Sequence, residues 1–299
     1  MLAGCLIVTM VAAGISASVL NKYIVTYLHI SGKFFILSVQ TVFLLLILSA
    51  INFFILDNLS FKIFSIAALS VWMLPAVSLV IMIYSGLEAN ARLPISLFTV
   101  LKNLTIPVIA LHDTLYNGYK ITPLTLASFV LILGSSFLGA YSSDKKRRDS
   151  VSLLGILWMM VNCFSSAAYI IRFNSIVRKT DVNSAAAAWI VNALAFPMIF
   201  LCFLVEGVGD AKGARMKEIG IIALSGGAAC SIAVANAQAA HTFTTTTVAV
   251  INALNKLPIA ASGVIFGFES TGRASKWVAV LMGVASSILY AVSRSPAHQ

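Results

Sequence analysis

Long apolar stretches, separated by short polar connections, make up almost the whole chain. An α-helix needs about 20 apolar residues to cross the hydrocarbon core of a bilayer, and ten stretches reach or approach that length. They are residues 2–20, 34–56, 63–85, 93–112, 121–142, 151–171, 184–205, 219–239, 243–268 and 276–293. The connections leave no room for a soluble domain. The pattern therefore predicts an all-α polytopic membrane protein with ten transmembrane helices.

The composition supports this class and excludes others. Apolar residues make up 60% of the chain and charged residues 10%, whereas soluble globular proteins carry about 25% charged residues. The net charge is +10, yet no basic stripe with interleaved aromatic residues lies outside the predicted spans, so no nucleic-acid partner is expected. The basic run from Lys145 to Arg148 is instead expected to contact membrane lipids through their headgroups.

The ninth predicted span contains an ammonium group and two carboxamides. A lysine near the middle of a span costs roughly 3 kcal/mol on insertion scales, so it is retained where it faces a wet cavity or a counter-charge. On a helix, Thr245, Asn252 and Lys256 form one polar stripe. Pro258 follows and lacks a backbone donor, so the helix is expected to kink or open there. Pairing of Lys256 with a buried carboxylate is the alternative reading.

The fourth predicted span repeats this arrangement. Thr99, Lys102 and Asn103 are spaced i, i+3 and i+4, and Thr105 and Pro107 follow. When the ten spans are divided into two sets of five, the fourth span corresponds to the ninth. Paired interruptions at matching positions point to a midplane site in transporters built from repeats. The predicted domains are therefore a first five-helix repeat (1–143), a connecting loop (144–150) and a second five-helix repeat (151–299).

Other polar residues extend the predicted chamber without indicating catalysis. Asn192 in the seventh span and Asn236 in the eighth could line it together with the two lysines. The cysteines lack metal-ligand spacing and are read as packing residues, so no metal site is expected. Gly263 and Gly267 form a small-residue face that permits close helix packing and a homodimer.

The two lysine motifs carry a resemblance to a known family. The segment Leu101 to Ile106 resembles the FKNLTI segment of Golgi GDP-mannose transporters, in the drug/metabolite transporter superfamily, and Asn252 to Pro258 resembles their GALNKLP segment. The resemblance implies two inverted five-helix repeats that exchange a cytosolic nucleotide sugar for a luminal nucleoside monophosphate. It implies a Golgi or other secretory-pathway membrane and no cofactor.

The resemblance also implies substrate-binding residues. The segment that holds the sugar and phosphates corresponds here to Asn252, Ala253, Leu254, Asn255 and Lys256. The opposite wall of the chamber corresponds to Lys102, Asn103 and Thr105.

The chain departs from the family pattern at several positions. The tyrosine before the GALNK segment is Val248 here, and the glycine of GALNK is Asn252. The FYNN signature that reads guanine is Trp189-Ile190-Val191-Asn192 here, so only its second asparagine remains. Asn192-Ala193-Leu194 is also similar to a segment of UDP-sugar transporters. A UDP-sugar/UMP antiporter is therefore the alternative to GDP-mannose/GMP exchange.

Two further expectations concern topology and reaction class. Apart from the two mid-span lysines, twelve Lys and Arg residues lie in odd-numbered loops, whereas six lie in even-numbered loops and the termini. The positive-inside rule places the twelve in the cytosol, opposite to the family topology with cytosolic termini. A membrane-bound glycosyl-transfer enzyme is the remote alternative, but no DxD or HxxxD pattern is present, so no catalytic residue is expected.

Overall fold

The described part of the chain is helical. The computed structural model describes residues 2–28, 32–54, 66–118, 121–141, 152–180, 182–206, 216–242, 265 and 274–293, which form helices and no strand. The helices are α1 (Leu2–Thr26), α2 (Lys33–Phe54), α3 (Ile66–Arg92), α4 (Ile95–Leu101), the 3₁₀ turn η2 (Lys102–Leu104), α5 (Thr105–Asn117), α6 (Pro123–Tyr141), α8 (Leu153–Lys179), α9 (Ser184–Glu206), α10 (Met216–Thr242) and α12 (Ala274–Ser293).

The predicted spans can be compared with these helices. Within the described ranges, each predicted span except the ninth overlaps a helix, and six helices are long and apolar enough to cross a membrane. Shorter apolar helices cover Pro123–Leu138 and Trp277–Tyr290. The fourth span is not one continuous α-helix, because η2 interrupts it. The ninth span, apart from Ile265, and the loop 144–150 lie outside the described residues, so the two-repeat arrangement stays a prediction.

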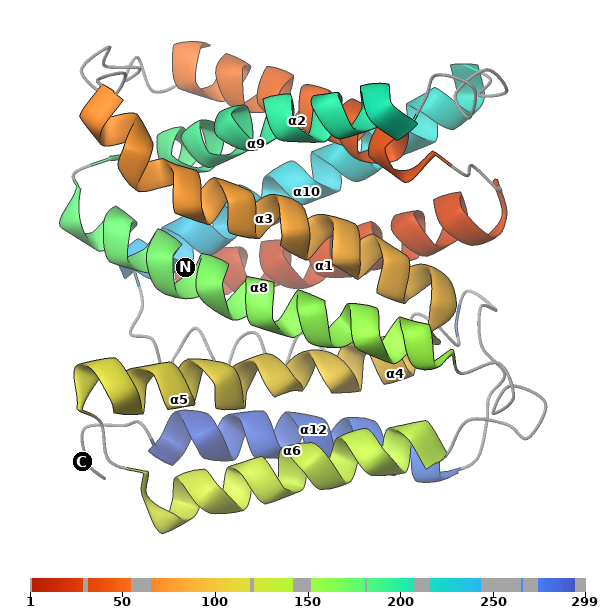
Figure 1. Ribbon diagram of the computed structural model, residues 1–299, viewed down its shortest axis with the longest axis vertical. Coiled ribbons are helices and arrows are strands. Elements are labelled where there is room, and N and C mark those ends of the chain that lie inside the picture. Colours follow the sequence, from red (N-terminus) through yellow and green to blue (C-terminus); the bar gives the residue numbers. More distant parts are fainter. Residues whose placement is uncertain are drawn as a thin grey trace. The chain divides into compact units, whose positions relative to one another are not determined.

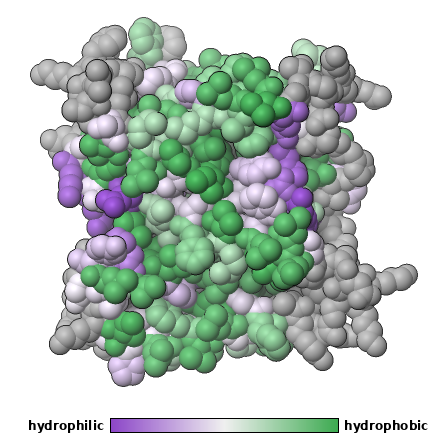
Figure 2. Space-filling view, viewed as in Figure 1, coloured by the Kyte–Doolittle hydropathy of each residue, from purple (hydrophilic) through white to green (hydrophobic). Residues whose placement is uncertain are grey.

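Apolar side chains cover much of the helical surface. Figure 2 shows them over the middle of the helices on the face drawn, with polar side chains mostly toward the helix ends. Large apolar side chains that are exposed include Phe53, Phe137 and Val205. Such a surface is expected for helices surrounded by lipid tails.

The chain divides into two compact units, each built from both halves of the sequence. Unit 1 comprises residues 1–87 and 168–242, and unit 2 comprises residues 88–167 and 243–299. The divisions fall inside α3 and α8, so each of these helices contributes to both units.

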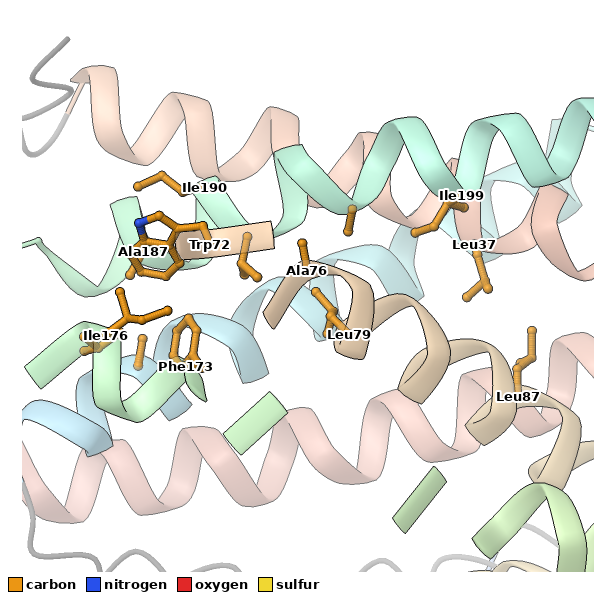
Figure 3. Close-up of a cluster of buried hydrophobic side chains, with 14 of the residues drawn as sticks. Leu37, Trp72, Ala76, Leu79, Leu87, Phe173, Ile176, Ala187, Ile190 and Ile199 are labelled. Carbon is orange, nitrogen blue, oxygen red and sulfur yellow. The ribbon is translucent and has the colours of Figure 1, made fainter. Parts of the chain in front are cut away.

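Unit 1 has an apolar core formed by α1, α2, α3, α8, α9 and α10. Figure 3 shows Trp72 of α3 near Ala187 of α9 and Phe173 of α8. The rings of Trp72 and Phe173 meet edge-on, with their centroids 6.1 Å apart, a favourable geometry for aromatic pairs. This cluster holds α8 and α9 against α3.

Polar contacts in unit 1 fix α2 against α1 and α10. The Gln40 amide Nε2 donates to Asn21 Oδ1 of α1 at 2.8 Å and to Ser225 Oγ of α10 at 2.5 Å. The next residue on α10, Gly226, lies so close that an added Cβ would be 2.7 Å from the Gln40 carbonyl oxygen. The two helix backbones therefore approach each other closely at this point.

The amino-terminal end of α2 is capped from α9. The backbone N–H groups of Lys33 and Phe34 donate to the two carboxylate oxygens of Glu206, at 3.2 and 2.9 Å. These donors lack partners within their own helix. A negatively charged carboxylate is also stabilised by the positive end of the helix dipole. The contact joins the start of α2 to the last residue of α9.

Unit 2 contains α4, η2, α5, α6, α12 and the first part of α8. The helices α6 and α12 pack side by side, and α4 contacts both (Figure 1). Leu97 and Leu101 of α4 pack with Met159 and Cys163 of α8 in a buried apolar cluster. This packing brings the end of α4, where the first lysine motif begins, against the middle of α8.

Candidate functional site

The first lysine motif lies at a break in the fourth predicted span. Lys102, Asn103 and Leu104 form the 3₁₀ turn η2, between α4 and α5. Pro107 accounts for the position of the break, because its ring would clash with the carbonyl four residues earlier, at Asn103, and it has no N–H to donate there. Proline is tolerated near the start of a helix, and here it is the third residue of α5. The motif therefore lies at a helix interruption.

The Lys102 ammonium is bound by two neutral oxygen atoms of α8. Its Nζ donates to Asn162 Oδ1 and, at 2.6 Å, to Ser166 Oγ. Both acceptors are buried, whereas Lys102 is only partly buried. Among the described residues, no carboxylate pairs with Lys102. Within the part of the chain that the structure describes, the positive charge is thus held in place by neutral partners.

The backbone beside Lys102 is also held by α8. The Cys163 thiol donates to the main-chain carbonyl oxygen of Leu101 at 3.4 Å. In an uninterrupted α-helix that carbonyl would accept from the N–H four residues later, at Thr105, but the Thr105 N–H bonds within η2 instead. Asn162, Cys163 and Ser166 have the i, i+1, i+4 spacing of one helix face, and together they bind this break.

Asn103, the second residue of the motif, faces α12. Its side chain is buried, and its Oδ1 accepts from the Ser287 hydroxyl at 3.4 Å. An added Cβ at Gly283 would lie 2.6 Å from Asn103 Nδ2, so the glycine provides the space for the amide. Thr105 is also buried, and its hydroxyl oxygen has no hydrogen-bond partner among the described residues.

Replacing Gly283 with alanine is expected to displace the Asn103 amide. Overpacking of this kind costs about 1–3 kcal/mol, so the melting temperature of the purified protein should fall. Gly134→Ala is the matched control, because its Cβ would meet only Met282 Cε at an ordinary 3.6 Å. Equal melting temperatures for the two variants would contradict the close fit of Asn103 against α12.

The other predicted site residues lie in unit 1 or outside the described residues. Asn192 of α9 is buried, and its amide donates to the carbonyl of Ala188 in its own helix at 2.8 Å. Asn236 is exposed on α10. Trp189 is directed to α2, where its Nε1 donates to Ser49 Oγ at 2.9 Å.

The second lysine motif cannot be compared with the structure. Its predicted binding residues Asn252, Ala253, Leu254, Asn255 and Lys256 lie outside the described residues, and their role stays a prediction.

The sequence interpretation missed the partners of Lys102. Asn162 and Ser166 are four residues apart in an otherwise apolar span, which places them on one helix face. That spacing is the signal that could have identified them. It does not reveal that Lys102 is the residue they contact, because Lys102 and Asn162 are sixty residues apart in the sequence.

Comparison with known proteins supplies the family. The chain is 30% identical to the GDP-mannose transporter of Komagataella pastoris over 292 residues, which cover 95% of this chain and 88% of that protein. It is 30% identical to the GDP-mannose transporter of Aspergillus oryzae, with 94% and 78% covered. It is 27% identical to that of Schizosaccharomyces pombe, with 97% and 86% covered. These relatives are named as transporters, not as enzymes.

The remaining comparisons concern the fold. A solved structure matches with a TM-score of 0.62 and 13% identity, over 94% of this chain and 95% of its own; at that identity the likeness concerns the fold alone. No protein-family model matches the chain. The described ranges contain six apolar helices of membrane-spanning length. Together with transporter relatives over nearly the full chain, they identify an integral membrane protein. The chain belongs to the family of GDP-mannose transporters.

Proposed function

We propose that the protein carries GDP-mannose across a Golgi or other secretory membrane in exchange for GMP. The observation that carries this proposal is the Lys102 ammonium, which lies in an apolar segment and, among the described residues, is bound by two neutral oxygen atoms and no carboxylate. A charge in such surroundings is costly and marks a substrate pathway. A phosphate group supplies the negative charge that the two neutral partners do not.

The proposed reaction is transport without covalent chemistry. A nucleoside diphosphate sugar and a nucleoside monophosphate both carry phosphate, so the same ammonium can bind either. The second lysine motif, Asn252 to Lys256, is proposed to bind the sugar and phosphate end of the substrate. Asn103 and Thr105 are proposed to line the opposite wall, with Asn192 and Asn236 completing the chamber.

The proposed architecture is ten transmembrane helices in two inverted five-helix repeats. Helix pairing supports it: α2 packs against α9, and α6 packs against α12. In the predicted numbering these are spans two and seven, and spans five and ten. Each pair joins equivalent positions of the two halves, an arrangement that a twofold relation between repeats can produce.

A UDP-sugar/UMP antiporter is the second candidate. At the position of the guanine-reading signature, Trp189 donates its indole N–H to Ser49, and the Asn192 amide N–H is directed to its own helix. These contacts leave the recognition of guanine less well supported than the binding of phosphate. The named relatives favour GDP-mannose.

The test is exchange in liposomes that contain the purified protein. The vesicles are loaded with GMP, UMP or neither, and uptake of labelled GDP-mannose and of a labelled UDP-sugar is measured. We expect GDP-mannose uptake that requires internal GMP and is lost in Lys256→Ala. Uptake of the UDP-sugar driven by UMP would replace the guanine assignment with the uridine one. No exchange with either nucleotide would overturn the proposed function.

A further inference from the structure

We propose that Asn162 and Ser166 of α8 are positioning residues of the phosphate site. They hold the Lys102 ammonium through hydrogen bonds. Because they are neutral, they leave its charge available to a phosphate. The inference rests on the proposed function, since it assigns two further residues to the same site.

The hydrogen bonds of Ser166 orient it as an acceptor for Lys102. The Ser166 hydroxyl donates its single hydrogen to the main-chain carbonyl of Asn162 at 2.5 Å. Its oxygen lone pairs are then available to the ammonium, 2.6 Å away. A hydroxyl has one donor and two acceptor positions, so this arrangement fixes which of them faces Lys102.

The burial of the three residues differs in a way that suits anion binding. Asn162 is 2% exposed and Ser166 1% exposed, whereas Lys102 is only partly buried. The acceptors are therefore enclosed by protein, and Lys102 is the least buried residue of the three. An ammonium has three N–H donors, and the two α8 acceptors account for two of them.

The chemistry of the acceptors distinguishes a binding site from a structural contact. A carboxylate at position 162 or 166 would neutralise Lys102 and would hold η2 against α8 at least as firmly. An amide and a hydroxyl instead bind the ammonium while leaving a net positive charge. If Asn162 only holds the helices together, its replacement by aspartate should leave phosphate binding unchanged. If it positions Lys102 for phosphate, the same replacement should weaken phosphate binding.

The decisive variant is Asn162→Asp, studied as purified full-length protein. Binding is measured as the rise in melting temperature on titration with inorganic pyrophosphate, GMP and UMP. The pyrophosphate concentration for half-maximal stabilisation is expected to rise about tenfold or more, since the new carboxylate competes with phosphate for Lys102. The melting temperature without ligand should not fall, because the carboxylate pairs with the ammonium.

The matched control is Asn174→Asp. It makes the same substitution on the same helix three turns further on, at a partly buried position. The control should retain the wild-type response to pyrophosphate. A similar loss in both variants would show a general effect of an added acid and would overturn the proposal.

A milder variant covers the case in which Asn162→Asp does not fold. Ser166→Ala removes one hydrogen-bond acceptor and is expected to raise the KM for exchange about threefold, with little change in maximal rate. Ser166→Thr keeps the hydroxyl and should restore the wild-type KM. A wild-type KM in Ser166→Ala would contradict the positioning role.

The outcomes separate this inference from the proposed function. If pyrophosphate and UMP stabilise the wild type and GMP does not, the guanine assignment fails while the role of Asn162 can still be confirmed. If the wild type exchanges GDP-mannose for GMP and Asn162→Asp keeps its affinity for pyrophosphate, the function stands and the inference fails. If none of the three probes stabilises the wild type, both are overturned.

Discussion

Replacing Lys102 with methionine is expected to reduce GDP-mannose exchange by about 30-fold or more at low substrate concentration. Removing one partner of a buried charge contact costs about 2–5 kcal/mol, and 1.4 kcal/mol corresponds to about tenfold in affinity. Methionine keeps a long flexible side chain but has no charge. The protein should remain folded, because an isolated ammonium in an apolar segment opposes insertion into the membrane.

The control for this variant is Lys217→Met, which removes a cation from the exposed start of α10. The two variants have the same net charge, so a comparison isolates the position of the lost ammonium. Exchange is measured in liposomes loaded with GMP, and folding is checked by gel filtration and melting temperature. Equal exchange by Lys102→Met and Lys217→Met would contradict a phosphate role for Lys102.

Replacing Gly226 with alanine is expected to destabilise unit 1. The added Cβ would lie 2.7 Å from the Gln40 carbonyl oxygen and 3.1 Å from its Cα, and main-chain atoms cannot move aside as the end of a side chain can. The strain is expected to cost about 1–3 kcal/mol. It would also pull Ser225 away from the Gln40 amide, so the melting temperature and the yield of monodisperse protein should both fall.

The adjacent glycine provides a matched comparison. An added Cβ at Gly227 would meet only Ile47 Cδ1, at 3.8 Å. Alanine also favours a helix over glycine by about 1 kcal/mol, so Gly227→Ala should be neutral or slightly stabilising. A Gly226→Ala variant as stable as Gly227→Ala would show that α2 and α10 do not approach as closely as described.

The class of fold followed from the sequence because apolar run length alone predicts a membrane helix. The interruption after Leu101 was less predictable. Pro107 and the polar residues before it indicated a kink, but the extent of η2 depends on contacts with α8. Cys163, for example, satisfies the Leu101 carbonyl that the break exposes. From the sequence alone, Cys163 was interpreted as an apolar packing residue.

The candidate site was predictable only in part. Lys102 and Asn103 stand out in an apolar span because polar groups are costly there. Their partners do not stand out, because serine and asparagine in a span are commonly helix-to-helix hydrogen bonds. Gly283 was equally inconspicuous, since its importance comes from the Asn103 amide that packs against it. Such information is tertiary and requires the structure.

The separation of Lys102 from its partners along the chain has a consequence for biosynthesis. Asn162 and Ser166 follow it by 60 and 64 residues, which a ribosome adds in roughly 3–13 s at about 5–20 residues per second. During that interval α4 and α5 emerge before the helix that binds the ammonium exists. The nascent segment must therefore wait beside the translocon or in contact with water, and a chain truncated before α8 should be a substrate for quality control.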